Sequence, residues 1–301
     1  MKIDFSSRHN ILFHSREDDS LRPMDEPYYL SSYIADGVWM IRSEGCNTYL
    51  VEGDDEAVVI DTGYAAGDLR AFCQCLTTRP VNRVINTHDH FDHSALNGLF
   101  DAAIMSEKTA PLATKPFPSF EGITFPTDYE KVIVHDGDVI DIGNRRLTFI
   151  ETPDHAVGSI MILDERSGIL FTGDEVSRFG KDLNGYVETV YRQFLRVEEY
   201  RSKFSFVCGG HEGKKDAGII DSITENLAHI LDGAEGTIPE PRNFRLPGPK
   251  EDGKGNIIWE RDMPHPGDIP AKDHSGEEWN RVMDYAGCRV QYNLKKIHEE
   301  S

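Results

Sequence analysis

The chain has 301 residues, of which 39% are hydrophobic and 28% are charged, a composition typical of a globular protein with a substantial core. Its formal net charge of -20 repels polyanions and argues against a nucleic-acid substrate. The sequence contains no apolar run long enough to span a membrane, and its first residues lack the apolar region of a secretory signal. We therefore predict a cytoplasmic protein without a membrane partner.

The first part of the chain predicts strands followed by a helix. Short apolar stretches at 32–41, 47–53 and 57–63 are separated by turn residues, as in strands joined by hairpins. Residues 66–78 have helical spacing, and residues 81–87 have the pattern of another strand. A short helix is expected after them, at 94–101.

The second part of the chain repeats this style. Strands are predicted at 131–143 and 145–153, and a hairpin at 159–174 with its turn at 165–168. Helices are predicted at 187–204 and 217–234, on either side of a strand at 205–211. Because β-rich sequence alternates with helices twice, we predict an α/β fold with two sheets covered by helices.

A change in composition marks the last part of the chain. Seven prolines between 236 and 276 predict a loop, with a possible short strand at 256–260. Alternating residues at 287–297 predict a final strand that returns to the core. The predicted organisation is an N-terminal extension (1–32), a core (33–235), a Pro/Gly-rich loop (236–280) and a C-terminal strand (281–301).

A dense cluster of titratable residues, NTHDHFDHSA, follows the strand at 81–87. His88 and His90 project to the same side of an extended segment and can share one metal ion. Asp92 and His93 follow at once and cannot easily join that pair on the same ion, so we expect a second metal. Because two zinc ions need more protein ligands than these four residues supply, others must come from elsewhere.

Three residues at predicted strand ends are candidates for the missing ligands: His155, Asp174 and His211. Glycine or proline lies close to each, and backbone turns there expose side chains. Alone, His155 or His211 would be an ordinary surface or capping histidine. Their ordered occurrence after the cluster favours metal binding.

The motifs THDHFDH, TPDHAVGS, FTGD and GGH, together with VVIDTG, resemble those of the metallo-β-lactamase superfamily over about residues 33–232. The resemblance implies a four-layer αββα sandwich with metal ions at one edge of the sheets. It also implies a role for Asp61, which would hydrogen-bond to a ligand-bearing loop. The alternative is that Asp61 only caps a turn.

The same resemblance implies how the ligands are shared between two zinc ions. The first ion would be held by His88, His90 and His155. The second would be held by Asp92, His93 and His211. Asp174 would bridge both ions, and iron or manganese could replace zinc.

The resemblance further implies a hydrolase in which a metal-bridging hydroxide is the nucleophile. Asp92 and Asp174 are the expected catalytic residues, because Asp174 sets the spacing of the metals and Asp92 receives or orients the proton. True β-lactamases have cysteine or serine at the aspartate of FTGD, so the chain is more similar to the glyoxalase II-like and lactonase branches. The expected substrate is an ester, thioester or lactone of a small molecule.

Other functions of the same fold stay open. A mononuclear iron persulfide dioxygenase would use His88, His155 and Asp174, and a phosphodiesterase is a further alternative. Ser177 occupies the position of a tyrosine in acyl-homoserine lactonases, which speaks against that substrate. A non-enzymatic metal scaffold is the third reading. Metal analysis would separate the dioxygenase from the hydrolase, and a panel of ester, lactone and phosphodiester substrates would separate the scaffold from the hydrolase.

The substrate pocket is less clearly indicated than the metal ligands. Tyr186, Tyr191 and Trp259 are candidate substrate-binding residues, and Arg192 and Phe244 are considered with them. The alternative for each is that it only packs or faces solvent. The oligomeric state is open, with a homodimer as one possibility.

Overall fold

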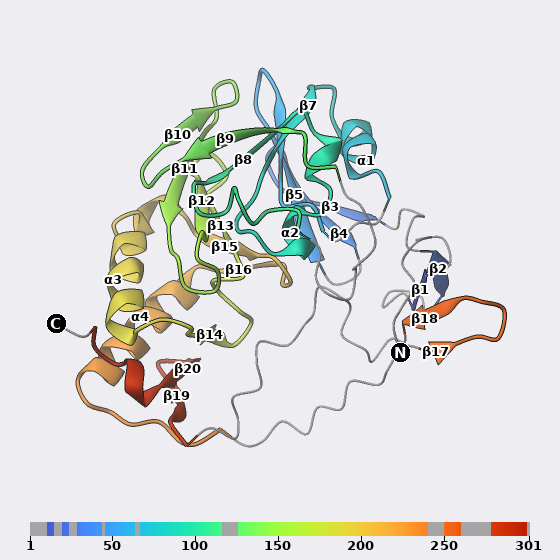
Figure 1. The fold of residues 1–301 in the computed structure, drawn as a ribbon. Helices are drawn as coiled ribbons and strands as arrows, with labels where there is room; N and C mark the ends of the chain where they lie inside the picture. The colour runs from blue at the N-terminus through green and yellow to red at the C-terminus, as the bar shows by residue number, and fades with distance from the viewer. Residues whose placement is uncertain are drawn as a thin grey trace. The chain divides into compact units, whose positions relative to one another are not determined.

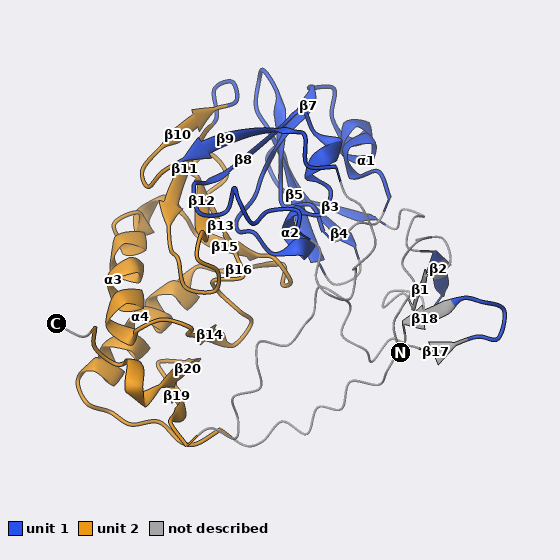
Figure 2. Ribbon diagram, viewed as in Figure 1, with its two compact units in different colours: residues 1–134, 142–145, 244–270 blue, residues 135–141, 146–243, 271–301 orange. Residues whose placement is uncertain are grey.

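The computed structural model describes residues 11–14, 20–23, 29–43, 46–63, 67–115, 126–239, 250–259 and 278–299. Figure 1 shows their helices and strands. The chain divides into two compact units (Figure 2), unit 1 with residues 1–134, 142–145 and 244–270, and unit 2 with residues 135–141, 146–243 and 271–301. Each unit has its own sheets and its own buried core.

A seven-stranded sheet forms the centre of unit 1. Its strands lie side by side in chain order: β3 (Leu30–Ala35), β4 (Val38–Ser43), β5 (Cys46–Glu52), β6 (Ala57–Ile60), β7 (Val81–Ile85), β8 (Ala102–Ser106) and β9 (Glu130–Val134). Neighbours are antiparallel from β3 to β6 and parallel from β6 to β9. Parallel neighbours need a crossover, and helix α1 (Leu69–Leu76) supplies the one between β6 and β7.

Helix α1 covers this sheet because its apolar residues recur one turn apart. Asp68 caps the helix and accepts a hydrogen bond from the Ala71 N–H at 3.0 Å. Leu69 and Cys73 are fully buried in one cluster with strand residues such as Val59 and Val84. The helix predicted at 66–78 is therefore confirmed, with the capped part of that segment forming it.

A six-stranded sheet and two helices form most of unit 2. In spatial order the strands are β10 (Val139–Asp141), β11 (Arg146–Glu151), β12 (Ile160–Asp164), β13 (Ile169–Gly173), β15 (Phe206–Gly209) and β16 (Lys214–Asp216). Helix α3 (Val187–Glu198), a 3-10 turn η4 (Arg201–Lys203) and helix α4 (Gly218–Leu231) complete it. The predicted hairpin at 159–174 is confirmed as β12 and β13.

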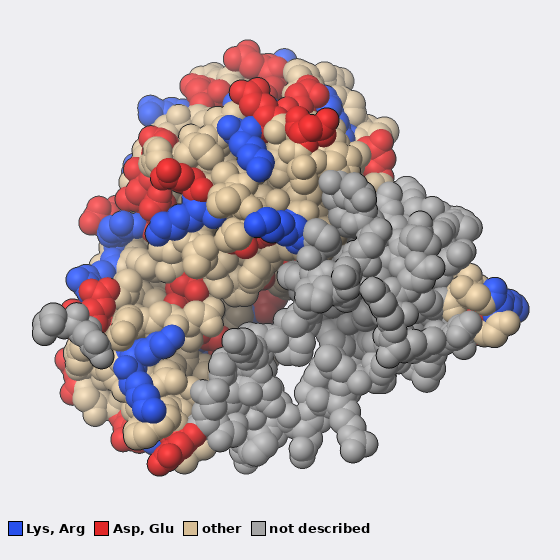
Figure 3. Space-filling model, in the orientation of Figure 1, with Lys and Arg blue, Asp and Glu red and all other residues tan. Residues whose placement is uncertain are grey.

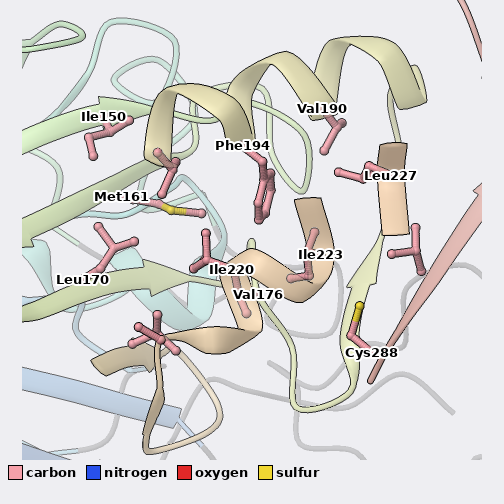
Figure 4. Close-up of a cluster of buried hydrophobic side chains, with 14 of the residues drawn as sticks. Ile150, Met161, Leu170, Val176, Val190, Phe194, Ile220, Ile223, Leu227 and Cys288 are labelled. Carbon is pink, nitrogen blue, oxygen red and sulfur yellow. The ribbon is translucent and has the colours of Figure 1, made fainter. Parts of the chain in front are cut away.

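The core of unit 2 lies where α3 and α4 meet the sheet. Figure 4 shows Val190 and Phe194 of α3 and Ile223 and Leu227 of α4 in one cluster with Met161 of β12. All five side chains are fully buried. Burial of each side chain of this size contributes about 1.5–3 kcal/mol, which is why the apolar stripes of both helices face the sheet.

A three-stranded sheet in unit 2 contains the end of the chain. Its order is β14 (Gly180–Asp182), β20 (Cys288–Asn293) and β19 (Asn280–Tyr285), followed by a 3-10 turn η5 (Leu294–Lys296). Val290 and Tyr292 of β20 are buried in the unit 2 core. Strand β20 thus packs in the core of unit 2.

A small sheet in unit 1 joins segments that are far apart in the sequence. Its order is β17 (Lys250–Glu251), β18 (Ile257–Trp259), β1 (Ile11–His14) and β2 (Leu21–Pro23), and β1 runs parallel to β18. The short strand predicted at 256–260 is therefore observed. Residues 1–10 and most of the predicted loop, at 240–249 and 260–277, lie outside the described residues.

The prediction of a helix at 94–101 was wrong in position. The helical turn α2 spans Phe91–Ser94, within the cluster itself, and only a 3-10 turn η2 (Asn97–Leu99) follows. Buried side-chain bonds hold this segment instead of a helical ladder: Asn97 Nδ2 donates to Asn86 Oδ1 at 2.7 Å, and Asn86 Nδ2 donates to the His93 carbonyl at 2.9 Å.

No helix in the described residues combines the length and the apolar character that a membrane span requires.

Candidate metal centre

In unit 1, the turn after strand β7 brings two histidines together. His88 and His90 have ring centroids 4.6 Å apart. His88 is buried, whereas His90 is partly exposed. Two imidazoles at this distance, one of them open to solvent, can bind the same metal ion.

The helical turn α2 carries the next two candidates, Asp92 and His93, and both are buried. The His93 Nε2 atom lies 3.4 Å from Asp92 Oδ2, so the two adjacent residues converge on one point. Cys46 on β5 places its Sγ atom 3.9 Å from the same Asp92 oxygen. The thiol adds a contact to Asp92 that the sequence analysis did not identify.

Asp61 links the pair His88 and His90 to the pair Asp92 and His93 through hydrogen bonds. This buried residue has a left-handed φ of 58° at the end of β6. Its carboxylate accepts hydrogen bonds from the Thr87 N–H and the Thr87 hydroxyl, each at 2.8 Å, and lies 2.9 Å from His93 Nδ1. Thr87 Oγ1 is also 3.0 Å from His88 Nδ1. Asp61 thus contacts both the segment that carries His88 and the turn that carries His93.

This network assigns the tautomers of two histidines. The only hydroxyl proton of Thr87 goes to Asp61, so His88 Nδ1 must donate to Thr87 Oγ1. His93 Nδ1 must likewise donate to the Asp61 carboxylate. In the neutral form of each ring the lone pair is then on Nε2, the form in which a histidine binds a metal. The donor set therefore fits zinc, and also fits iron or manganese.

In unit 2, three strand ends bring His155, Asp174 and His211 together. Asp174 follows β13, His211 follows β15, and His155 follows β11. The Asp174 Oδ2 atom lies 3.1 Å from His211 Nε2 and 3.5 Å from His155 Nε2. All three side chains are partly exposed. One carboxylate oxygen therefore stands between two imidazoles.

A buried ion triad supports these strand ends. Lys181 lies 2.9 Å from Asp154 Oδ2 and also contacts Glu175, and all three side chains are almost fully buried. Asp154 precedes His155, and Glu175 follows Asp174. Glu175 Oε1 accepts the His155 N–H at 2.8 Å, and Asp154 Oδ1 accepts the Gly185 N–H at 2.7 Å. The triad thus ties the two ligand-bearing turns to each other.

The triad is strongly coupled electrostatically. Burial raises the pKa of the Glu175 carboxyl, and the positive charge of Lys181 opposes that shift. Burial alone would lower the pKa of Lys181, but the charges of Asp154 and Glu175 outweigh it and hold the pKa above its ordinary value. The ammonium form of Lys181 is therefore strongly stabilised.

The sequence analysis missed this triad. Its one signal was the presence of a carboxylate directly beside each of two predicted ligands, His155 and Asp174. Nothing local identifies Lys181 as their partner, because a lysine in a short strand is usually exposed.

The predicted substrate-binding residues lie in different environments, and two of their side chains lie outside the described residues. Tyr186 caps α3 and is partly buried, and Tyr191 packs against the unit 2 core. Arg192 is exposed and pairs with Glu299 at 2.7 Å. The backbone of Trp259 pairs in β18, whereas its side chain and Phe244 lie outside the described residues.

Comparison with known proteins identifies the family. The sequence profile of the metallo-beta-lactamase superfamily matches residues 42–211, more than half of the chain. The chain belongs to the metallo-beta-lactamase superfamily. This membership confirms the resemblance drawn from the motifs and the predicted αββα fold class, and it confirms an enzyme of a metal-dependent family.

Relatives of this metallo-beta-lactamase superfamily chain include the acyl-coenzyme A thioesterases MBLAC2 of Bos taurus and Homo sapiens. Each is 31% identical over 188 aligned residues, and the match covers 50% of this chain and 67% of the relative. Among solved structures, a metallo-beta-lactamase from Pontibacter korlensis has a TM-score of 0.52 at 20% identity, covering 67% of this chain and 99% of its own. The structural similarity supports the fold alone. The similarity to the thioesterases is used below in the proposal of a function.

Proposed function

We propose that this chain is a dinuclear zinc hydrolase that cleaves thioesters of small molecules. The observation that carries the proposal is the position of Asp174, whose Oδ2 atom lies between His155 and His211 as a metal-bridging carboxylate would. The similarity to acyl-coenzyme A thioesterases favours a thioester over the other esters and lactones that the motifs allow.

We propose that seven residues share the metal ions. Unit 1 contributes His88, His90, Asp92 and His93, and unit 2 contributes His155, Asp174 and His211. Zinc prefers about four ligands, so neither set by itself would satisfy two ions. The first ion would take His88, His90 and His155, the second would take Asp92, His93 and His211, and Asp174 would be shared.

The chemistry follows from these groups. Two bound zinc ions would supply Lewis acidity, lowering the pKa of a water molecule and stabilising negative charge on the carbonyl oxygen of the substrate. Asp92 would accept the proton that this water loses. The C–O bond forms, the C–S bond breaks, and the thiolate leaves and takes up a proton, so that a carboxylic acid and a thiol result.

Residues around the ligands keep them in position for this reaction. Asp61 and Thr87 hold His88 and His93 in the tautomer that presents Nε2. Asp174 would fix the spacing of the ions. Zinc as the resident metal, the cytoplasmic location and a homodimer remain predictions.

The test is to measure metal content and thioester hydrolysis together. Purified chain should contain about two zinc ions and should release free thiol from acyl-coenzyme A. The Asp174→Ala variant should lose zinc and at least about 100-fold in kcat/KM, as expected for removal of a metal ligand. The matched control is Asp182→Ala, an exposed aspartate of unit 2, which should keep both properties.

Two results would contradict this proposal. A stoichiometry of one iron per chain with oxygen consumption would favour the persulfide dioxygenase. Full metal loading without hydrolysis of any thioester, ester, lactone or phosphodiester would favour a metal scaffold.

A further inference from the structure

A hollow of about 670 Å³ opens on unit 2, beside the segment that follows Asp174. One wall is the hairpin of β19 and β20, and the other is the turn before β14. The side chains that matter for its chemistry are two arginines, two aromatic rings and one carboxylate: Arg178, Arg289, Phe179, Tyr285 and Asp284. None of them is used by the proposed metal centre.

The backbone holds the two walls together. The Arg289 N–H donates to the Phe179 carbonyl at 2.7 Å, and Gly180 of β14 stands opposite Arg289 of β20. A Cβ atom at Gly180 would lie only 1.9 Å from the Arg289 carbonyl oxygen, so the close approach requires glycine. The hairpin itself is closed by a two-residue turn. The hollow is therefore built on paired strands.

The charge of the hollow favours an anion. In the described part of the chain, neither Arg178 nor Arg289 has an ion pair with a carboxylate. Among the described residues of the lining, Asp284 is the one acidic side chain, so positive charge exceeds negative charge there. This local excess occurs in a chain of net charge -20. Guanidinium groups bind phosphate through paired hydrogen bonds.

The aromatic side chains favour a planar group beside that anion. Phe179 is 67% exposed, and the Arg178 guanidinium carbon lies 5.4 Å from the centroid of its ring. Tyr285 is 43% exposed and stacks on His229 with ring centroids 4.0 Å apart. Exposed rings next to arginine are surfaces on which a nucleobase can stack.

We propose that this hollow binds the phosphorylated adenine nucleotide end of a coenzyme A thioester. The proposal rests on the thioesterase function proposed above and adds the means of recognising the thiol part of the substrate. Arg178 follows Asp174 by four residues, so the chain between their Cα atoms spans at most about 14 Å. The pantetheine arm of coenzyme A is long enough to reach from the hollow to Asp174.

The test compares two thioesters with the same acyl group. One is acyl-coenzyme A, and the other is acyl-N-acetylcysteamine, which has the thioester but no nucleotide. For zinc-loaded chain carrying Arg178→Gln and Arg289→Gln, the KM ratio of acyl-coenzyme A to the truncated thioester should rise at least about tenfold, the effect of losing one charge-assisted bond. The control Arg146→Gln removes an exposed arginine elsewhere in unit 2 and should leave the ratio unchanged.

A variant that should lower the KM serves as a control, because misfolding could explain a higher KM but not a lower one. Asp284→Asn removes the carboxylate from the hollow and should lower the KM for acyl-coenzyme A. A ratio that stays constant in the double arginine variant would overturn the proposal.

Direct binding separates this proposal from the proposed function. Adenosine 3′,5′-bisphosphate should bind the full chain in calorimetry, and Arg178→Gln should weaken its Kd about tenfold. If no thioester is hydrolysed but the bisphosphate binds in this way, the hydrolase proposal fails and the nucleotide site stands. Absence of bisphosphate binding to the unmodified chain would exclude the site whatever the activity.

Discussion

At the scale of single residues, the buried triad of Lys181, Asp154 and Glu175 shows how charge can be kept inside unit 2. Glu175 accepts the His155 N–H, Asp154 accepts the Gly185 N–H, and Lys181 offsets the negative charge of both carboxylates. A buried ion pair contributes little net stability, but removing one partner leaves an uncompensated charge. Its role is therefore to specify one arrangement of the two turns.

Replacing Lys181 with methionine should destabilise the protein by about 3–5 kcal/mol, because Asp154 and Glu175 would stay buried without a cation. Adding Glu175→Gln to this variant should recover part of the loss. Urea unfolding measures both effects. The matched control is Lys203→Met, which breaks an exposed pair with Glu165 and should cost less than about 1 kcal/mol. Equal stability of the Lys181 and Lys203 variants would refute the role of the triad.

At the scale of elements, the three-stranded sheet of unit 2 depends on one close approach and one tight turn. Gly180 has a φ of 142° and sits against the Arg289 backbone, whereas Gly287 has a φ of 79° in the β19–β20 turn with open space around its Cα. Both positions favour glycine through their φ angles, but only Gly180 is also restricted by a neighbouring strand.

The Gly180→Ala variant should therefore be destabilised by more than Gly287→Ala. The turn variant should lose about 1–2 kcal/mol from the left-handed conformation alone. The Gly180 variant should lose more, because β14 must also separate from β20. Thermal unfolding of the two variants gives the comparison, and a larger loss for Gly287→Ala would contradict this account of the sheet.

At the scale of the whole molecule, acidic side chains outnumber basic ones, but the two kinds are interspersed on the surface shown in Figure 3. The chain carries 52 acidic and 32 basic side chains. On the face shown in Figure 3, acidic and basic side chains are interspersed among the described residues. A high net negative charge of this kind favours solubility and attracts cations to partly exposed carboxylates and imidazoles such as Asp174 and His211.

Metal binding should stabilise the folded chain, because the proposed ligands come together only in the native state. Zinc that binds only the native state at about 1,000 times its Kd adds about 4 kcal/mol, so a chelator should lower the Tm on the order of 10 °C. Differential scanning fluorimetry with and without chelator measures the shift. The Asp174→Ala variant should respond much less. A chelator that removes the metal without changing the Tm would show that the proposed ligands do not link metal binding to folding.

How far the fold could be predicted depended on how local each signal was. The helices at 69–76, 187–198 and 218–231 followed from apolar spacing, which is a property of neighbouring residues. The helical turn α2 was misplaced, because the bonds of Asn86 and Asn97 that shape this segment join residues eleven positions apart. Arg145 is a similar case: it is buried and donates to the Glu52 carbonyl at 2.8 Å, which no local pattern indicates.

The candidate ligands and their order along the chain could be predicted from the sequence, because histidines and aspartates at strand ends carry their chemistry wherever the strands lie. The sequence also placed Asp61 in its motif. The groups that support these candidates could be found only from the folded structure. Lys181 reaches Asp154 across 27 positions, and Arg178 and Arg289 line one hollow although 111 positions separate them. Such partners depend on strand pairing and burial, which are set by the packing of the whole unit.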